Sequence, residues 1–194
     1  MNRGRRNLLC AASLLPVGPR WVSAAAADES AWRLLTAGGC AVLLRHAQTV
    51  AGLGDPPGFR LDDCSTQRNL SEAGRAEARR FGAEFARRGI SVDAVLSSGW
   101  CRCLDTARLA FPRHEVRVFE ALNSFFADGS AREAQTAELR GYLARPRAPR
   151  RIVLVTHMVN IAALTGQSVG MGEALLVRTG AAKAGELLGR FATT

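Results

Sequence analysis

Lysine is nearly absent from this chain of 194 residues, because Lys183 is the single lysine among 26 basic residues. The other basic residues are arginines, whose planar guanidinium donates paired hydrogen bonds to phosphate or carboxylate oxygens in a way that lysine does not. Part of this bias reflects genome composition, since alanine and glycine are also abundant. The formal net charge of +9 nevertheless favours an anionic ligand or partner.

Long apolar segments and paired metal-binding cysteines are also missing. No stretch is long and apolar enough to span a bilayer as a helix, so we expect no stable membrane span. No Cys-x-x-Cys pair occurs, which disfavours a zinc site. Hydrophobic residues make up 47% of the chain and charged residues 22%, a balance typical of one globular domain of this length.

Acidic residues are absent before Asp28. The preceding segment combines arginines at 3, 5 and 6, a short apolar core at 8–15 and small residues at 23–27, which is the layout of a secretory signal peptide. The sequence "GRRNLL" (4–9) also loosely fits a twin-arginine export signal, and a basic tail is the alternative. We therefore expect a signal peptide at 1–27, a single domain at 28–194, and a periplasmic or secreted protein.

The cysteines that follow the expected signal peptide are even in number, which suits an oxidising compartment. A disulfide between Cys64 and either Cys101 or Cys103 is compatible with the sequence, but spacing does not choose between the two. These cysteines are Cys40, Cys64, Cys101 and Cys103.

Short continuous apolar segments alternate with segments of helical periodicity along the expected domain. Strands that are apolar on both faces are typical of a mostly parallel sheet covered by helices on either side, so we predict an α/β three-layer sandwich. A long segment at 47–69 has no periodicity and is expected to be a functional loop. We expect strands at 41–45, 92–98, 115–119, 152–157, 173–178 and 185–191, and helices at 30–38, 72–88, 101–111, 130–144 and 159–166.

Polar side chains follow three of the expected strands. The first strand ends in Arg45 and His46, the second is followed by Arg102 at the start of a helix, and the fourth ends in His157. Because the carboxyl ends of parallel strands meet at one edge of the sheet, we expect these four side chains to lie together. Such a concentration of positive charge favours a bound phosphate, with a histidine available as nucleophile.

Four segments resemble the motifs of the histidine phosphatase superfamily, also called the phosphoglycerate mutase-like family. They occur in the order of that family and are Arg45-His46-Ala47, "RNLSEAGRAEA" (68–78), "LSSGWCRCLDTA" (96–107) and "VLVTH" (153–157). The resemblance implies a phosphoglycerate mutase-like fold in which His46 is the nucleophile that becomes phosphorylated. It also implies that Arg45, Arg102 and His157 hold the phosphoryl group, and that a phosphomonoester or phosphoramidate is hydrolysed without metal or cofactor.

Two positions depart from the family pattern. Ala47 stands in place of a glycine, which is tolerable if the backbone there does not adopt a positive φ. Ser124 stands where larger members carry a glutamate that donates a proton, so Glu120 or Asp128 must serve as the acid, or the leaving group needs none. The short, exported chain resembles phosphohistidine phosphatases, and "ALNSFF" and "THMVNI" resemble lipopolysaccharide core heptose phosphatases.

The expected partner is therefore a small phosphorylated substrate or a phosphorylated envelope component, and not a nucleic acid. The alternative is a noncatalytic phosphate- or polyanion-binding protein on the same fold, which includes a phosphatase that has lost turnover. Against a polyanion binder, the arginines are scattered along the chain with few aromatic residues between them.

Overall fold

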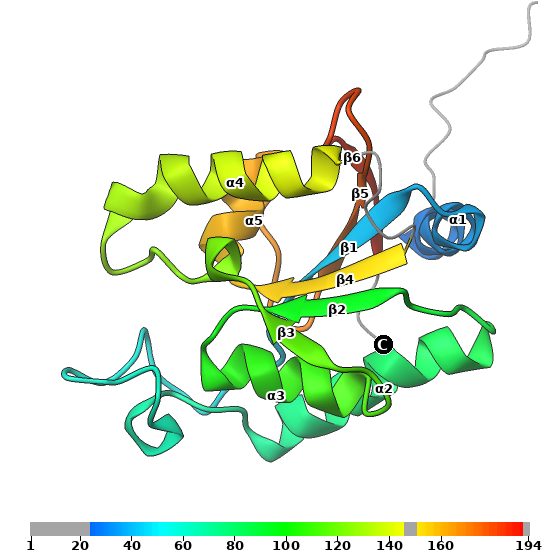
Figure 1. The fold of residues 1–194 in the computed structure, drawn as a ribbon. Helices are drawn as coiled ribbons and strands as arrows, with labels where there is room; N and C mark the ends of the chain where they lie inside the picture. The colour runs from blue at the N-terminus through cyan, green and yellow to red at the C-terminus, as the bar shows by residue number, and fades with distance from the viewer. Residues whose placement is uncertain (1–23, 146–150, 192–194) are drawn as a thin grey trace, which may run out of the picture.

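A six-stranded sheet forms the centre of the molecule, in a computed structural model that describes residues 24–145 and 151–191 (Figure 1). Its strands are arranged in the order β3-β2-β4-β1-β5-β6. Strands β1 to β4 are mutually parallel, whereas β5 runs antiparallel to β1, and β6 runs antiparallel to β5. The strands are β1 (Cys40–Arg45), β2 (Ala94–Ser97), β3 (Val116–Val118), β4 (Arg151–Thr156), β5 (Ala174–Arg178) and β6 (Leu187–Phe191).

Helices cover both faces of this sheet, which confirms the predicted three-layer α/β architecture (Figure 1). One face packs against α1 (Ala24–Ala37), α2 (Glu72–Arg87) and α3 (Cys101–Ala110). The other face packs against α4 (Arg132–Ala144) and α5 (Met158–Thr165). Within the described ranges, no helix is long and apolar enough to cross a membrane.

The apolar composition of the central strands follows from this layering. In β1, Val42 and Leu44 belong to the core shared with α1, α2 and α3, whereas Ala41 and Leu43 belong to the core shared with α4 and α5. Successive side chains of a strand point to opposite faces, so a strand between two helical layers must be apolar at every position. All four of these side chains are buried.

Several helix ends lie where the sequence predicts them. Ser71 caps α2, and its hydroxyl accepts a hydrogen bond from the Gly74 amide at 3.1 Å. Gly89 and Gly166 follow α2 and α5 with φ of 63° and 73°, conformations that glycine adopts without steric cost.

The first helix is longer than predicted. We expected it to begin at Ser30, but α1 begins at Ala24, because four consecutive alanines favour the helical state more strongly than Ser30 favours a cap. The expected signal peptide and the boundary after residue 27 depend on residues 1–23, which lie outside the described residues.

Candidate active site

The structure brings the two predicted histidines together at the carboxyl ends of β1 and β4. Their ring centroids lie 5.4 Å apart, and both side chains are buried. The neighbouring strands are parallel and in register, with Arg45 opposite Thr156, and the His46 amide donates a hydrogen bond to the Thr156 carbonyl at 3.0 Å. Adjacent strands that end at the same level therefore account for the meeting of two residues that are remote in sequence.

His46 is neutral and has a defined tautomer. Its Nδ1 lies 2.9 Å from the carbonyl oxygen of Ala47, and because a carbonyl only accepts, Nδ1 carries the proton and Nε2 the lone pair. Burial is the main cause that lowers the pKa of His46 to about 3, and the nearby charges of Arg102 and Arg45 contribute to this lowering, against the effect of the Ala47 hydrogen bond. A neutral imidazole with a free Nε2 is a competent nucleophile.

His157 is held by its neighbours rather than by a carboxylate. Its Nε2 lies 2.9 Å from Oγ of Ser98, and Oγ in turn lies 3.2 Å from Oδ1 of Asn123. The ring also packs edge-on against Trp100, with centroids 5.3 Å apart. Burial lowers the pKa of His157 well below its usual value, and the charges of Arg102 and His46 act in the same direction.

Three arginines surround the histidines and line a shared cavity of about 340 Å³. Two of them, Arg45 and Arg102, are predicted site residues, whereas Arg68 was not assigned a role from the sequence. In each of the three, Nε is buried and has no hydrogen-bond partner. Burial lowers the pKa of Arg45 and of Arg68, and repulsion from neighbouring guanidinium groups adds to it, so an anion in this cavity would relieve a real electrostatic cost.

Asp55 supplies a carboxylate that the strand-end motifs do not contain. It comes from the 47–69 loop, and its Oδ1 accepts a hydrogen bond from Nη1 of Arg102 at 2.6 Å in a buried ion pair. Burial opposes ionisation of Asp55, but hydrogen bonds from Arg102, the Arg68 amide and the Trp100 indole outweigh it and hold the pKa of Asp55 below its usual value. Three guanidinium groups against one carboxylate leave the cavity positive.

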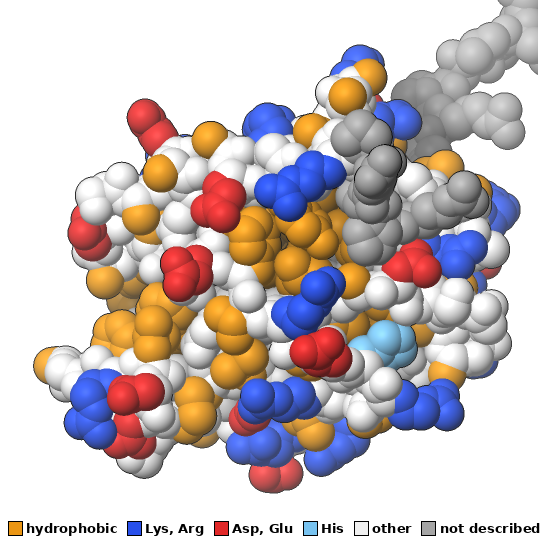
Figure 2. Space-filling model, in the orientation of Figure 1, with side chains coloured by type: hydrophobic (Ala, Val, Ile, Leu, Met, Phe, Trp, Pro, Cys, Tyr) orange, Lys and Arg blue, Asp and Glu red, His pale blue; other side chains and the backbone are white. Residues whose placement is uncertain are grey.

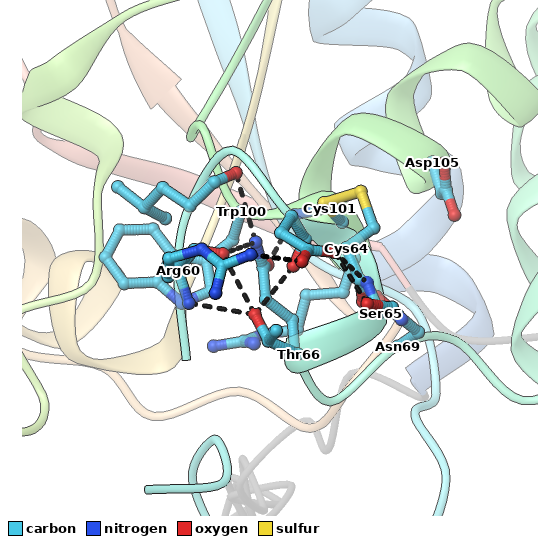
Figure 3. Close-up of a disulfide and its surroundings, with 12 residues drawn as sticks. Arg60, Cys64, Ser65, Thr66, Asn69, Trp100, Cys101 and Asp105 are labelled. Carbon is cyan, nitrogen blue, oxygen red and sulfur yellow. Dashed lines mark hydrogen bonds and ion pairs between the residues drawn. A yellow bond between two sulfur atoms is a disulfide. The ribbon is translucent and has the colours of Figure 1, made fainter. Parts of the chain in front are cut away.

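A disulfide fixes the loop that carries Asp55 (Figure 3). Cys64 is bonded to Cys101, the first residue of α3, which selects one of the two pairings that the sequence left open. Around the bridge, Nδ2 of Asn69 donates to the Cys64 carbonyl at 2.6 Å, and the Arg60 amide donates to Oγ1 of Thr66 at 2.8 Å (Figure 3). The loop is therefore tied to the helix that presents Arg102.

The other two cysteines of the described ranges, Cys40 and Cys103, are buried free thiols. Cys103 lies close to the site, with Sγ 3.4 Å from Nε2 of His157. Burial raises the pKa of Cys103 to about 12 and that of Cys40 to about 11. Both side chains are protonated thiols at neutral pH, and neither is an activated nucleophile.

Neither of the two acids considered from the sequence lies in the cavity. Glu120 is exposed in a short 3₁₀ helix, and Asp128 is exposed and caps the next one by accepting a hydrogen bond from the Ser130 amide at 2.9 Å. Ser124, in place of the family's glutamate, does line the cavity. Asp55 is therefore the one carboxylate among the lining residues, and it is already paired with Arg102.

The substitution of glycine by Ala47 is accommodated by the backbone. Among the described residues, Lys183 is the one non-glycine residue with a positive φ, so Ala47 has an ordinary conformation. Its amide donates to Oγ1 of Thr106 at 3.0 Å, which connects the end of β1 to α3. No group of three or more His, Cys, Asp or Glu side chains that could hold a metal ion occurs in the described part of the chain.

Asp55 and Arg68 could not be assigned from sequence for a physical reason. Both come from the 47–69 loop, which has no hydrophobic periodicity and follows no strand end closely enough to predict which of its side chains reach the cavity. Arg68 opens the segment "RNLSEAG", whose likeness to a family motif was the one available signal.

Comparison with known proteins agrees with this geometry. The model of the histidine phosphatase superfamily (branch 1) matches residues 41–128, a range that includes Arg45, His46 and Arg102. No curated protein matches the sequence significantly.

Solved structures share the fold at low sequence identity. The protein histidine phosphatase SixA complexed with tungstate has a TM-score of 0.58 and 13% identity, covering 79% of this chain and 97% of that one. The α-ribazole phosphatase from Shigella flexneri has a TM-score of 0.55 and 18% identity, covering 80% and 96%. A mycobacterial glucosyl-3-phosphoglycerate phosphatase in complex with VO3 has a TM-score of 0.53 and 22% identity, covering 71% and 92%. The family model thus matches a little under half of the chain, and the solved structures show that the chain shares the fold of several phosphatases.

Proposed function

We propose that the protein hydrolyses a phosphomonoester or phosphoramidate through a phosphohistidine intermediate on His46, without a metal ion. The observation that carries this proposal is a neutral imidazole with a free Nε2 in a cavity lined by three guanidinium groups. The tungstate and VO3 complexes of two proteins of similar fold support it, because both oxyanions resemble phosphate in shape and charge.

The first step transfers the phosphoryl group to the protein. Nε2 of His46 attacks phosphorus with its lone pair, the N–P bond forms, and the bond to the leaving group breaks with its electron pair. The guanidinium groups of Arg45, Arg68 and Arg102, which line the cavity, are donors for the phosphoryl oxygens. The charge of the bound phosphoryl group raises the pKa of His157, whose protonated ring then adds a further donor.

The second step returns the protein to its starting state. Water attacks phosphorus, the N–P bond breaks with its electron pair returning to Nε2, and inorganic phosphate leaves. Since Asp55 is ionised and paired with Arg102, it is a poor proton donor, so the leaving group takes its proton from water. We therefore propose that the natural leaving group is a weak base that needs little protonation.

The nucleophile is tested with 4-nitrophenyl phosphate in the presence of a chelator. We expect His46→Ala to lower kcat/KM by at least about a thousandfold, because the covalent route is lost. The matched control is His114→Ala, which removes the third histidine of the chain at an exposed position outside the cavity. A phosphoenzyme that forms on the unmodified protein and is absent in His46→Ala would support the covalent step. Equal rates in the two variants, or turnover that stops with the chelator, would reject the proposal.

We further propose that the protein acts in the periplasm or is secreted. The basic, apolar and small-residue layout of the first 27 residues supports export, and the Cys64–Cys101 disulfide suits an oxidising compartment. N-terminal sequencing of the protein recovered from the periplasm checks this, with Asp28 expected as the first residue.

A further inference from the structure

The cavity changes character from its floor to its mouth. Its floor holds the buried histidines and arginines that are buried or partly buried, whereas its mouth is formed by apolar side chains that are partly or largely exposed. We call these apolar side chains the rim, and they are Leu53, Phe59, Phe126, Met158 and Val159. A ligand with its phosphate on the floor must place the rest of its atoms against this rim.

Two members of the rim are far more exposed than large apolar side chains usually are. Leu53 is 88% exposed and Phe126 is 54% exposed, although they come from different segments of the chain. Exposed apolar surface carries a free-energy cost in water, and its concentration around a cavity marks a ligand-binding surface. Phe59 continues this surface inward, since its ring lies 5.9 Å from that of Trp100.

Polar groups able to bind sugar hydroxyls are scarce around the same mouth. Besides the residues assigned to the phosphoryl group, the polar side chains of the lining are Ser124 and Asp55. The Asp55 oxygens already accept hydrogen bonds from Arg102, the Arg68 amide and the Trp100 indole. Sugar hydroxyls placed here would lose water without gaining partners, which disfavours a sugar phosphate.

We propose that the rim selects substrates in which the phosphate is attached to an aromatic or similarly flat apolar group, with Leu53 and Phe126 as specificity-determining residues. This inference rests on the proposed phosphatase activity and names its substrate class. In the reaction, the bond between phosphorus and the oxygen or nitrogen of that group breaks with its electron pair on the leaving atom, which takes a proton from water. Aromatic leaving groups are also the weaker bases that a site without a free acid handles best.

The test compares benzyl phosphate with glucose 6-phosphate, which both leave as primary alcohols and so differ mainly in what the rim contacts. We expect kcat/KM to be at least about tenfold higher for benzyl phosphate. Leu53→Ser and Phe126→Ser should each raise KM for benzyl phosphate by about three- to tenfold, with little change in kcat or in the glucose 6-phosphate reaction. Leu61→Ser is the matched control, because Leu61 is exposed in the same loop but does not line the cavity.

Inhibition by inorganic phosphate shows whether the variants remain folded. Its inhibition constant should stay within about twofold in all three variants, since phosphate reaches the floor without touching the rim. Glucose 6-phosphate hydrolysed as well as benzyl phosphate, or unchanged KM values in both rim variants, would overturn the inference and leave the phosphatase activity standing. Failure of the unmodified protein on every phosphate ester would instead contradict the proposed function, and the substrate class with it.

Discussion

At the scale of single residues, burial rather than a carboxylate partner controls the histidines of the site. Burial and the charges of the neighbouring arginines favour the neutral ring of both His46 and His157. The hydrogen bond from Nδ1 of His46 to the Ala47 carbonyl then decides which nitrogen keeps its lone pair. The nucleophile is thus prepared by desolvation and by one backbone contact.

This state of the histidines predicts a pH-dependent stability. The pKa of His46 is about 3 in the folded protein and about 6.5 in an unfolded chain, so the unfolded chain binds more protons between these values. The contribution is fully present above pH 6.5 and is lost as the pH falls toward 3. Between pH 7.5 and 5.0 we expect His46 to lower the free energy of unfolding by roughly 1–2 kcal/mol, and His157, whose pKa is also lowered by burial, to act in the same direction.

Urea denaturation at the two pH values measures this loss. His114→Ala should keep the full dependence, because that ring is exposed, and His46→Ala should show a smaller one. A free energy of unfolding that is flat between pH 7.5 and 5.0 would contradict the assignment of neutral, buried rings.

Sequence reasoning was strongest where a residue follows a strand. Arg45, His46 and His157 could be placed at one sheet edge because the ends of parallel strands share that edge. Asp55 and Arg68 could not, since they reach the same cavity through a loop whose path depends on the disulfide and on the ion pair with Arg102.

At the scale of elements, α2 and α3 pack so closely that a side chain cannot fit between them. A Cβ built on Gly82 of α2 would lie 1.8 Å from the carbonyl oxygen of Ala110 at the end of α3. The close approach matters for the site because α3 also carries Arg102. Glycine is required at this position by space, not by an unusual backbone conformation.

Gly82→Ala should therefore lower the free energy of unfolding by about 3 kcal/mol, because the two helices must separate. Gly141→Ala is the matched control in the last turn of α4, where a Cβ meets nothing within 4 Å. That change should raise the free energy of unfolding by about 0.5–1 kcal/mol, because alanine favours the helix. Denaturant unfolding of both variants measures the free energy of unfolding. Equal changes in the two variants would show that α2 and α3 can accommodate a side chain at Gly82.

The order and direction of the elements were only partly accessible from the sequence. Apolar segments and caps predicted the helices and strands, because burial and capping leave local signals. The antiparallel direction of β5 beside β1 left no such signal, since it depends on which strand the chain pairs with after α5. The start of α1 was missed because alanines also fit the end of a signal peptide.

At the scale of the whole molecule, the positive charge is interrupted by acidic side chains. Figure 2 shows Lys and Arg intermingled with Asp and Glu on the face it presents. Several exposed arginines form ion pairs, including Arg60 with Asp63, Arg87 with Glu84 and Arg178 with Glu186. The described part of the face in Figure 2 therefore shows no continuous basic stripe of the kind that nucleic-acid binding requires.

We therefore expect weak binding to nucleic acid despite the net charge of +9. Fluorescence anisotropy with duplex DNA in 150 mM salt should give a Kd weaker than about 10 μM. A Kd below about 1 μM with a steep salt dependence would favour the polyanion-binding alternative. Competition by inorganic phosphate is the control, because it should leave such a surface interaction nearly unchanged.

The attachment of the 47–69 loop has a consequence for how this protein could be re-engineered or diversify. The segment 50–54 lies between two residues with fixed positions, Thr49 and Asp55. Oγ1 of Thr49 accepts a hydrogen bond from Nη1 of Arg68 at 2.6 Å, and Asp55 forms an ion pair with Arg102. Gly52 and Gly54 give the segment freedom of shape, and Leu53 is its contribution to the rim. The side chains of this pentapeptide could therefore be exchanged to change which substrates bind, provided that the Gly52 carbonyl keeps the hydrogen bond that it accepts from Nη1 of Arg68 at 3.0 Å.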